Sequence, residues 1–476
     1  MTTPSEIRDP RRAMPTAGTD IQPASRRGVI SWYLFDWAAQ PVATLITTFV
    51  FAPFFVDYIA EGAGHDSDSG QAIWGWTLAA AGIVIALLSP VLGAIADAAG
   101  RRKPWVAAFS VPLVIGCGLL WFTEPGASGA VAFALAGVFL ATIGAEFATV
   151  FTNAMMPNLV RPDRLGRLSG SGWAIGYLGG VVSLVILLGL LVADPDDGET
   201  FFGLSPLFGL DPATYEGVRA TGPLAVLWYL AFVPFLFLFT PDAPRMMAAG
   251  AAVRTGLRAI RGTLTGIRRH ANAFRFLVAH MIYADGLAGL FAFGGVYATS
   301  TFGWGTTEFL LFGMIVVIAA VPGAFFGGRL DDRIGSKRII VTALIILILA
   351  SIAALSITSD RILFFLAADP AVEGDGMYAT LGEKLYLLVG AIIGAVSGPL
   401  QAASRTLIVK LSPRDKVAEF FGLYALSGRL TTFLAAASVA AITALADSQR
   451  IGISVLLVFF VVGGLILLGV RPPARG

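Results

Sequence analysis

The sequence predicts an all-α membrane protein in which twelve transmembrane helices form two halves of six. Three observations lead to this prediction. Hydrophobic residues make up 56% of the chain and charged residues only 13%, whereas about 25% of the residues of a typical soluble domain are charged. Twelve runs of predominantly apolar residues follow one another, each near the roughly 20 residues that an α-helix needs to cross a bilayer. Finally, a short motif occurs twice, about half the chain apart.

The apolar runs place the expected helices in chain order. They lie at 29–58, 73–98, 105–123, 130–156, 168–193, 222–240, 274–301, 307–328, 339–358, 383–411, 419–446 and 451–470. The expected division is a cytoplasmic tail at 1–28, an amino-terminal half at 29–241, a cytoplasmic linker at 242–273, a carboxy-terminal half at 274–470 and a short tail at 471–476.

Arginine and lysine residues gather in the segments that would lie on one side of the membrane. The other side has only Arg219, Arg361 and Arg450, with Lys384 at a helix mouth. Positively charged loops remain in the cytoplasm, so both termini are expected there. The linker is basic, and the spacing of its arginines would suit one face of a helix lying on an anionic membrane surface.

The repeated motif reads GAIADAAGRRK at 93–103 and GRLDDRIGSKR at 328–338. Each copy has a glycine, an aspartate four residues later, a second glycine three residues after that, and then cations. Glycine allows a tight chain reversal and close helix contact, and the acid can form a charge cluster with the basic loop. The residues expected to form an inner gate are Gly93, Asp97, Gly100 and Arg101 in the first copy, and Gly328, Asp332, Gly335 and Lys337 in the second.

Charged residues inside the apolar runs are candidate site residues, because a charge in the bilayer is costly. They are Asp36, Glu146, Asp285, Arg405 and Arg429. Asp36 and Asp285 occupy comparable depths in the first helix of each half and resemble symmetry mates. Three acids against two arginines leave one acid without a cation, which makes it a candidate proton carrier. The alternative is that these residues form structural or gating ion pairs.

Neutral polar residues in the same helices add to the candidate site. Gln40 shares a helix face with Asp36, and Asn153, Gln401 and Ser404 lie in helices four and ten; they either bind a polar ligand or bond across helices. His280 is five residues from Asp285, about 140° around the helix, and is expected to be a packed histidine. The glycines of helix five are expected to serve close packing rather than an antiport signature.

The repeated motif closely resembles the loop between the second and third helices of major facilitator superfamily transporters. In that fold, helices one, four, seven and ten line a central cavity, and helices three, six, nine and twelve face outward. The segments at 31–55, 151–180, 282–298 and 398–430 resemble the vacuole-effluxer-like family, which includes autophagy-related amino-acid exporters. In that family helix one commonly reads YDWANS, whereas here it reads FDWAAQ. The resemblance implies export of amino acids or related small solutes.

The expected function is therefore secondary active transport by proton-coupled alternating access in a bacterial inner membrane, with one chain as the functional unit. The expected partners are a small-molecule substrate, protons and the lipid bilayer, with no nucleic acid, cofactor or metal. No enzyme is expected, because the sequence contains no phosphate-binding loop with lysine, no HExxH and no nucleophile elbow. One alternative is a transporter of lipophilic or lipid-like compounds. Another, of a different class, is a membrane assembly or delivery factor that does not transport.

Overall fold

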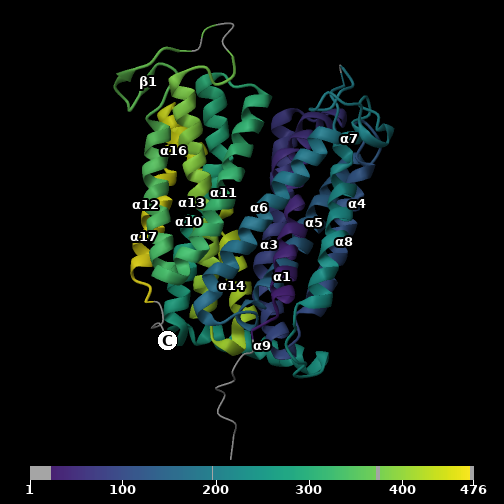
Figure 1. Ribbon diagram of the computed structural model, residues 1–476, viewed down its shortest axis with the longest axis vertical. Helices are drawn as coiled ribbons and strands as arrows, with labels where there is room; N and C mark the ends of the chain where they lie inside the picture. The colour runs from purple at the N-terminus through teal and green to yellow at the C-terminus, as the bar shows by residue number, and fades with distance from the viewer. Residues whose placement is uncertain (1–22, 196, 371, 373–375, 472–476) are drawn as a thin grey trace, which may run out of the picture.

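A computed structural model describes residues 23–195, 197–370, 372 and 376–471. Most of the two predicted tails, at 1–22 and 472–476, lies outside these residues. Within the described chain, eleven helices are long and apolar enough to cross a membrane, and a bent pair covering Arg26–Phe49 and Phe51–Ala60 makes a twelfth when counted as one span. The helices run side by side in one bundle (Figure 1). The predicted all-α membrane fold with twelve spans is confirmed.

The first half begins with a span built from four segments, α1 (Arg26–Pro41), η1 (Val42–Phe49), α2 (Phe51–Phe54) and η2 (Phe55–Ala60). The long helices that follow are α3 (Ser67–Ala99), α4 (Lys103–Leu119) with η3 (Leu120–Phe122), α5 (Ala130–Asn153), α6 (Leu165–Leu190) and α8 (Thr221–Phe239). Short helices in the connections are η4 (Met156–Asn158), η5 (Pro162–Arg164), η6 (Leu207–Gly209) and α7 (Glu216–Arg219).

The linker contains α9 (Ala249–Thr265) and η7 (Ile267–His270). The helices of the second half are α10 (Ala271–Phe302), α11 (Thr306–Ile334), α12 (Ser336–Leu355), α13 (Leu381–Leu411), η8 (Arg414–Lys416), α14 (Val417–Arg429), α15 (Thr432–Ala446), α16 (Gln449–Ser454) and α17 (Leu456–Leu468). In the connection before α13, β1 (Arg361–Ile362) pairs antiparallel with β2 (Leu366–Ala367).

Of the helices that the sequence predicts as continuous, the twelfth is divided into α16 and α17, and the first and the eleventh are broken close to the candidate site. The first span turns by 43°, and its π-helical segment η1 follows directly after Pro41, which has no backbone N–H to donate. Helix eleven is divided into α14 and α15. Short π-helical segments inside longer helices often occur at functional sites, and η1 contributes to the cavity described below.

The two halves meet through equivalent pairs of helices. The second helix of each half packs against the fifth helix of the other, so α3 contacts α14 and α11 contacts α6. A Cβ at Gly93 would lie 2.2 Å from the carbonyl oxygen of Ala418. Likewise, a Cβ at Gly170 would lie 2.6 Å from the Cα of Gly328. These crossings therefore require glycine, because any side chain would separate the helices.

The structure corrects several predicted boundaries. The second helix begins at Ser67 rather than at 73, because the Asp66 side chain accepts a hydrogen bond from the backbone N–H of Ser69 and caps the helix. The eighth helix continues to Ile334, so the aspartates of the second motif lie within its last turns. The predicted linker is partly helical, as α9.

Candidate substrate cavity and inner gate

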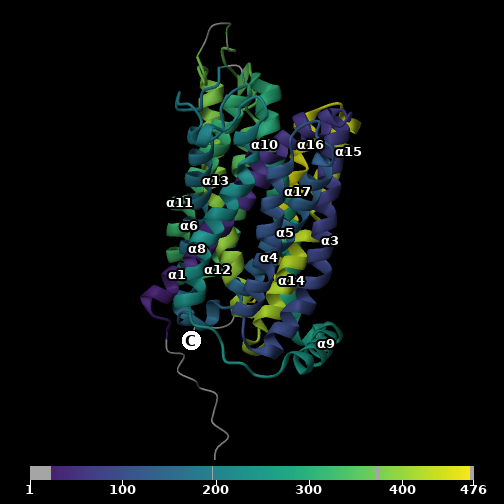
Figure 2. The ribbon, with the colours of Figure 1, turned by 90° about the vertical axis from the view of Figure 1, so that its right-hand side faces the viewer.

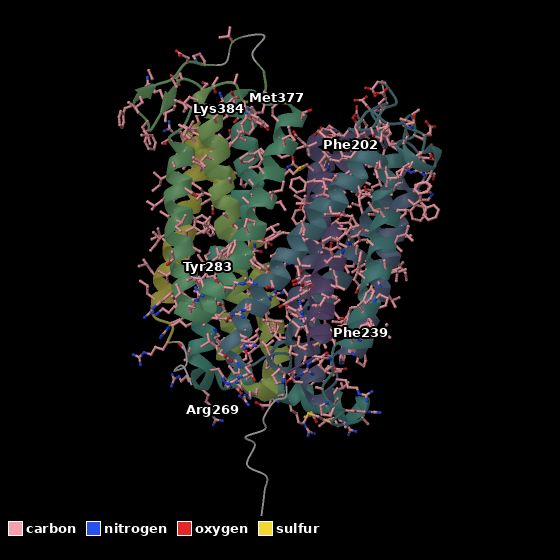
Figure 3. The ribbon with its side chains drawn as sticks, viewed as in Figure 1. Phe202, Phe239, Arg269, Tyr283, Met377 and Lys384 are labelled. Atoms are coloured by element: carbon pink, nitrogen blue, oxygen red, sulfur yellow. The ribbon has the colours of Figure 1, made fainter. Side chains whose placement is uncertain are left out.

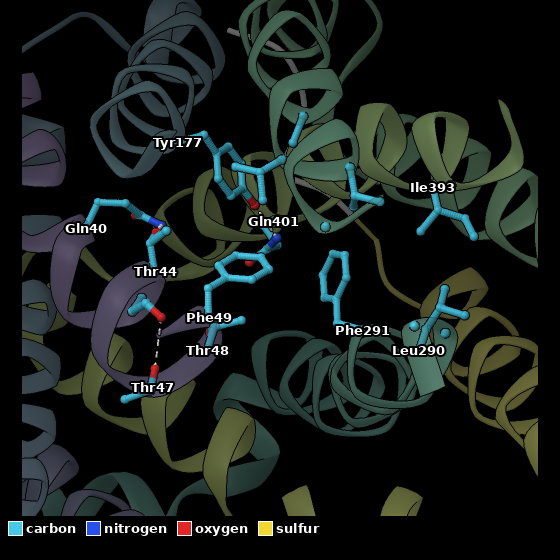
Figure 4. Close-up of a pocket in the computed structure, with 18 of the residues that line it drawn as sticks. Gln40, Thr44, Thr47, Thr48, Phe49, Tyr177, Leu290, Phe291, Ile393 and Gln401 are labelled. Carbon is cyan, nitrogen blue, oxygen red and sulfur yellow. Dashed lines mark hydrogen bonds between the residues drawn. The ribbon is translucent and has the colours of Figure 1, made fainter. Parts of the chain in front are cut away.

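A cavity of about 540 Å³ lies between the two halves. Its lining follows the first span from Asp36 to Phe49 and α10 from Leu290 to Tyr297. Both helices begin at the end of the bundle where the described chain starts and stops, here called the end that carries the termini (Figures 1 and 2), so the cavity extends toward the opposite end. In Figure 4, the rings of Phe49 and Phe291 point into it from the two halves.

Seven of the nine predicted substrate-site residues line this cavity: Asp36, Gln40, Glu146, Asn153, Gln401, Arg405 and Arg429. They belong to helices one, four, ten and eleven of the chain, which are far apart in the sequence. The fold therefore brings most of the predicted polar residues to one space.

Arg405 is held at the deep end of the cavity by a dense set of acceptors. Its Nη1 donates to Oδ2 of Asp36 at 3.1 Å and to Oδ1 of Asn153 at 3.0 Å. Its Nε and Nη2 donate to the hydroxyl and the carbonyl oxygen of Ser169, at 2.9 and 2.6 Å. Four of the five guanidinium N–H donors are thus used. The side chain of Arg405 is only 4% exposed and that of Asp36 14% exposed.

The glycine-rich start of α6 makes room for this ion pair. A Cβ at Gly172 would lie 2.6 Å from Oδ2 of Asp36 and 2.9 Å from Nη2 of Arg405. The guanidinium carbon also lies 5.1 Å from the ring centre of Trp32 and 5.6 Å from that of Trp173, within the range of a cation–π contact. The glycines of helix five thus accommodate a buried charge pair as well as close helix packing.

A second ion pair lies closer to solvent. Nη2 of Arg429 donates to Oε2 of Glu146 at 2.7 Å. The side chains of Arg429 and Glu146 are 38% and 27% exposed and line the cavity, so this pair is more open to a ligand than the first.

Both ion pairs join the two halves, and the charges are segregated by half. Asp36 and Glu146 are the acids of the first half, whereas Arg405 and Arg429 are the cations of the second. The structure thus adopts the ion-pair arrangement that the sequence left open as an alternative for these four residues.

Asp285 and Ser404 do not line the cavity. Asp285 is 2% exposed, and its Oδ2 accepts a hydrogen bond from the backbone N–H of Ala435 at 3.2 Å, just after the break between α14 and α15. Its Oδ1 has no partner among the described residues. Ser404 bonds to the hydroxyl of Tyr283 at 2.7 Å. The expectation that Asp285 occupies a position equivalent to Asp36 is wrong, because α10 turns this face toward helix eleven rather than toward the cavity.

His280 is a packed histidine, as expected. It is 7% exposed, its Nδ1 lies 2.8 Å from Oγ of Ser427, and its ring stacks on Tyr424 with a centroid separation of 4.0 Å. It therefore joins α10 to α14 and does not contact the cavity.

The first copy of the repeated motif fastens α3 to the start of α14. The Asp97 carboxylate accepts hydrogen bonds from the backbone N–H groups of Ala418 and Glu419, at 3.1 and 2.7 Å, and forms a salt bridge with Arg102. An acid at a helix N-terminus satisfies free N–H groups and complements the helix dipole. Burial lowers the pKa of the Arg102 guanidinium, and the charge of Asp97 opposes that shift.

The second copy fastens α11 to the start of α6 in the same way. Asp332 accepts hydrogen bonds from the backbone N–H groups of Gly166 and Arg167, at 2.8 and 3.1 Å. In each copy, the aspartate of one half therefore caps a helix of the other half, and the two caps hold the halves together at the end that carries the termini.

The remaining motif residues shape the ends of α3 and α11. Gly100 and Gly335 have φ angles of +91° and +96°, which favour glycine because a Cβ is strained there. Lys337 donates to backbone carbonyls at the end of α17, at 2.7 and 2.8 Å. Arg101 is exposed, so its expected role beside the acid belongs to Arg102 instead.

A second cavity, of about 1180 Å³, lies beside the second motif, near the end of α11. Its lining includes Asp332, Lys337 and Pro157, and it shares no residue with the first cavity. The boundary between the two linings falls at three residues along their helices: Arg405 on α13, Asn153 on α5 and Ser169 on α6. The polar contacts of Arg405 with Asn153 and Ser169 therefore lie on the part of these helices where the two linings meet.

Two helices expected to face outward also reach the first cavity. Helices nine and twelve of the chain, as α12 and α16–α17, contribute Ser351, Ala354, Leu355, Ile453 and Leu456 to its lining. Gly294 and Gly295 of α10 line the same cavity. Because they have no side chains, they leave α12, α16 and α17 accessible from the cavity. The expectation of an entirely outward-facing second layer is therefore wrong for the carboxy-terminal half.

Comparison with known families decides the identity. Residues 73–473 match the family described as vacuole effluxer Atg22 like. The chain belongs to this family. It is 23% identical over 437 residues to an uncharacterized MFS-type transporter, YxiO, of Bacillus subtilis, covering 92% of this chain and 93% of that one.

Fungal relatives match a shorter part of the chain. Autophagy-related protein 22 of Cryptococcus neoformans is 26% identical over 300 residues, covering 62% of this chain and 48% of the relative. The chain thus spans about half the length of such fungal members of the vacuole effluxer Atg22-like family.

Solved structures show the fold. The proton:xylose symporter XylE, determined with 6-bromo-6-deoxy-D-glucose, superposes with a TM-score of 0.68 at 13% identity, covering 94% of this chain and 96% of that one. The human organic anion transporter MFSD10 gives a TM-score of 0.63 at 14% identity, covering 94% and 100%. This Atg22-like protein therefore has the fold of the major facilitator superfamily, and its family and fold are those of a transporter rather than an enzyme.

The sequence reasoning missed several residues that the Atg22-like cavity uses. The predicted site does not include Ser169 or the two indoles around Arg405, because its neutral polar members are limited to Gln40, Asn153, Gln401 and Ser404. Tyr177 was also missed; its hydroxyl accepts a hydrogen bond from Nε2 of Gln401 at 2.7 Å (Figure 4). The signal was available, since Ser169 and Tyr177 lie in the glycine-rich stretch of α6.

Proposed function

We propose that this Atg22-like transporter exports amino acids or related small zwitterions by proton-coupled alternating access. The observation that carries the proposal is the pair of acid–arginine contacts, Asp36–Arg405 and Glu146–Arg429, at one cavity between the halves. A zwitterion has a carboxylate that can bind the arginine of such a pair and an ammonium group that can bind its acid.

The exposed pair is the better candidate for substrate exchange. A substrate carboxylate would replace Glu146 at Arg429, and its ammonium group would then bind the freed Glu146. Such an exchange leaves no buried charge without a partner, which would be costly inside the membrane. Phe49, Phe291 and Leu290 would contact an apolar side chain of the substrate.

The proton is proposed to bind at Asp285. Asp36 has a cationic partner, whereas the only hydrogen bond that Asp285 accepts in the described chain comes from a backbone N–H. A buried carboxylate without a cation is costly, and a bound proton removes that cost. Because Asp285 meets helix eleven just after the break that follows Arg429, a proton there can alter the position of this arginine.

We place the protein in a bacterial inner membrane, with both termini in the cytoplasm and one chain as the functional unit. Arg269 lies at the end of the bundle that carries the termini, and Lys384 and Met377 lie at the other end (Figure 3). The wider distribution of arginine and lysine in the sequence supports this orientation. Both halves that line the cavity belong to one chain, so the proposed transport cycle needs no second copy.

The test is transport of a labelled amino-acid mixture in proteoliposomes, with and without an imposed pH gradient. We expect accumulation that follows the gradient, and we expect Asp285→Asn to transport without responding to it. Movement of amino acids that is equal under both conditions would refute proton coupling but not the substrate class. No movement of any amino acid would refute the substrate class.

A second candidate function is transport of lipophilic compounds. It is favoured by the aromatic wall of the cavity, which includes Phe49, Phe291, Phe309, Phe312 and Tyr386. A lipophilic cation or acid would bind this wall with one charged group at an ion pair. Efflux of a fluorescent lipophilic cation from the same proteoliposomes, in the absence of amino-acid transport, would support this candidate instead.

A further inference from the structure

The linker helix α9 has two opposite faces of different character. One face is formed by Ala252, Gly256, Ile260 and Thr263, which are buried. A Cβ at Gly256 would lie 2.7 Å from the backbone of Ile95 in α3. The helix therefore packs tightly against the bundle through this face.

The opposite face of α9 is basic. Arg254, Arg258 and Arg261 are exposed, and at about 100° per residue they project away from the buried face. Val253 and Leu257 are 40% and 48% exposed and lie on the flank between the two faces. An apolar flank next to a row of arginines is the pattern of a helix that lies in a membrane interface.

No acidic residue balances these arginines in the surrounding sequence. Residues 243–284 contain seven arginines and no aspartate or glutamate. A surface of this charge attracts an anionic bilayer surface.

The position of α9 keeps it near the membrane. Residues 240–248 join it to the end of α8, and residues 266–270 join it to the start of α10, and both of these helices span the membrane. Five extended residues cover at most about 20 Å, so α9 cannot move far from the bilayer surface. In Figure 2, α9 lies at the lower edge of the bundle, beside the lower end of α3.

The buried face of α9 also contacts the first gate motif. The Ile95 backbone that Gly256 approaches lies two residues before Asp97, which caps α14. In addition, Nζ of Lys416, directly before α14, donates to Oγ1 of Thr263 at 2.7 Å. One face of α9 thus touches α3 and the residue directly before α14, the two helices that Asp97 joins, while the arginines of the other face are exposed.

We propose that the basic face of α9 binds an anionic lipid surface and that this binding stabilises the closed state of the inner gate. Lipid headgroups that hold α9 in place keep α3 and α14 together through Gly256 and Thr263. This inference concerns a surface outside the substrate cavity, and it does not depend on which substrate is transported.

The first test is lipid selectivity of the full chain. Native mass spectrometry of the purified protein should show preferential retention of phosphatidylglycerol over phosphatidylcholine. The triple variant Arg254→Gln, Arg258→Gln, Arg261→Gln should lose at least about tenfold of that preference. The matched control Arg161→Gln, Arg164→Gln, Arg333→Gln removes three exposed cations elsewhere and should keep it. An equal loss in both variants, or none in the α9 variant, would overturn the proposal.

The second test is the conformation of the inner gate. Nitroxide labels at cysteines replacing Asn158 and Arg338, which are exposed on opposite halves beside the second cavity, report the inner separation by pulsed spin resonance. Phosphatidylglycerol in the vesicles should shift the parent toward shorter distances and leave the α9 variant unchanged. A shift of equal size in the variant would show that lipid acts elsewhere. Binding of heparin through α9 without any response to the lipid would identify an acidic macromolecule as the partner and refute the proposal.

Discussion

The two ion pairs at the cavity have the same composition and very different surroundings. Arg405 is nearly buried and is held by an acid, an amide, a serine and two indoles. Arg429 is more than a third exposed and has one acid as its side-chain partner among the described residues. The first pair has few free donors to offer a ligand, and the second has several. We infer that the deep pair stabilises contact between the halves, whereas the shallow pair is available to substrate.

The largest expected effect comes from removing the deep cation. Arg405→Ala leaves the Asp36 carboxylate buried without its partner, which typically lowers the free energy of unfolding by 3–5 kcal/mol, as an order of magnitude. Unfolding in detergent, followed by tryptophan fluorescence, measures the loss. The double variant Asp36→Asn with Arg405→Met should recover most of the stability but not transport. A single variant as stable as the parent would show that the pair does not hold the halves together.

A smaller effect is expected when the space around the deep pair is filled. Gly172→Ala places a methyl group 2.6 Å from Oδ2 of Asp36, and such overpacking costs about 1–3 kcal/mol. Gly118→Ala is the control, because a Cβ there meets nothing within 4 Å. The comparison of the two variants in the same unfolding experiment tests whether the glycine of α6 serves the ion pair. Equal stability of the two variants would contradict that role.

The inner gate offers a comparison of the same kind between its two caps. Asp97 caps α14 and pairs with Arg102, whereas the exposed Arg167 lies 3.8 Å from Asp332 and adds little to that cap. Loss of a helix cap typically costs about 1 kcal/mol, so Asp97→Ala should shift the inner separation toward the open state by about fivefold or more. Asp332→Ala should shift it less. Spin labels at the positions described above measure both shifts, and a larger response to Asp332→Ala would reverse this ranking.

The smallest effect on stability is expected at the shallow pair. Arg429→Met should change the free energy of unfolding by less than about 1 kcal/mol, because exposed ion pairs contribute little. Its effect on transport should be large, with substrate affinity lowered at least about tenfold through loss of a charged hydrogen bond. Arg429→Lys keeps the charge and should retain part of the affinity. Unchanged transport by Arg429→Met would exclude this arginine from the substrate site.

Much of the fold was predictable, because it follows from patterns that are local in sequence. Apolar run lengths gave the spans, and the repeated glycine and aspartate positions gave the relation between the halves. The breaks were not predictable in the same way. The first span bends at Val50, nine residues after Pro41, and Leu430 and Thr431, between α14 and α15, include no proline. The contact next to the second break is made by another helix, because the Asp285 carboxylate accepts a hydrogen bond from the backbone N–H of Ala435.

The candidate site was predictable as a set of residue types but not as a set of contacts. The cost of charge in lipid picked out Asp36, Glu146, Arg405 and Arg429, and these line the cavity. The same argument selected Asp285, which is buried but does not line the cavity. Its side chain faces helix eleven, and this orientation depends on helix packing that the sequence does not reveal. Sequence alone also gave no reason to prefer one pairing of acids and arginines over another, because the partners lie 283 and 369 residues apart.

The reciprocal caps at the inner gate bear on the relation between the two halves. Asp97 of the first half holds a helix of the second, and Asp332 of the second holds a helix of the first. In each contact the aspartate and the helix that it caps belong to different halves. Neither half therefore forms the contact by itself. Two identical six-helix chains related by a two-fold axis would form the contact twice, as an isologous interface requires. The two caps therefore have the reciprocal form of an isologous contact, although both halves belong to one chain and are joined through α9.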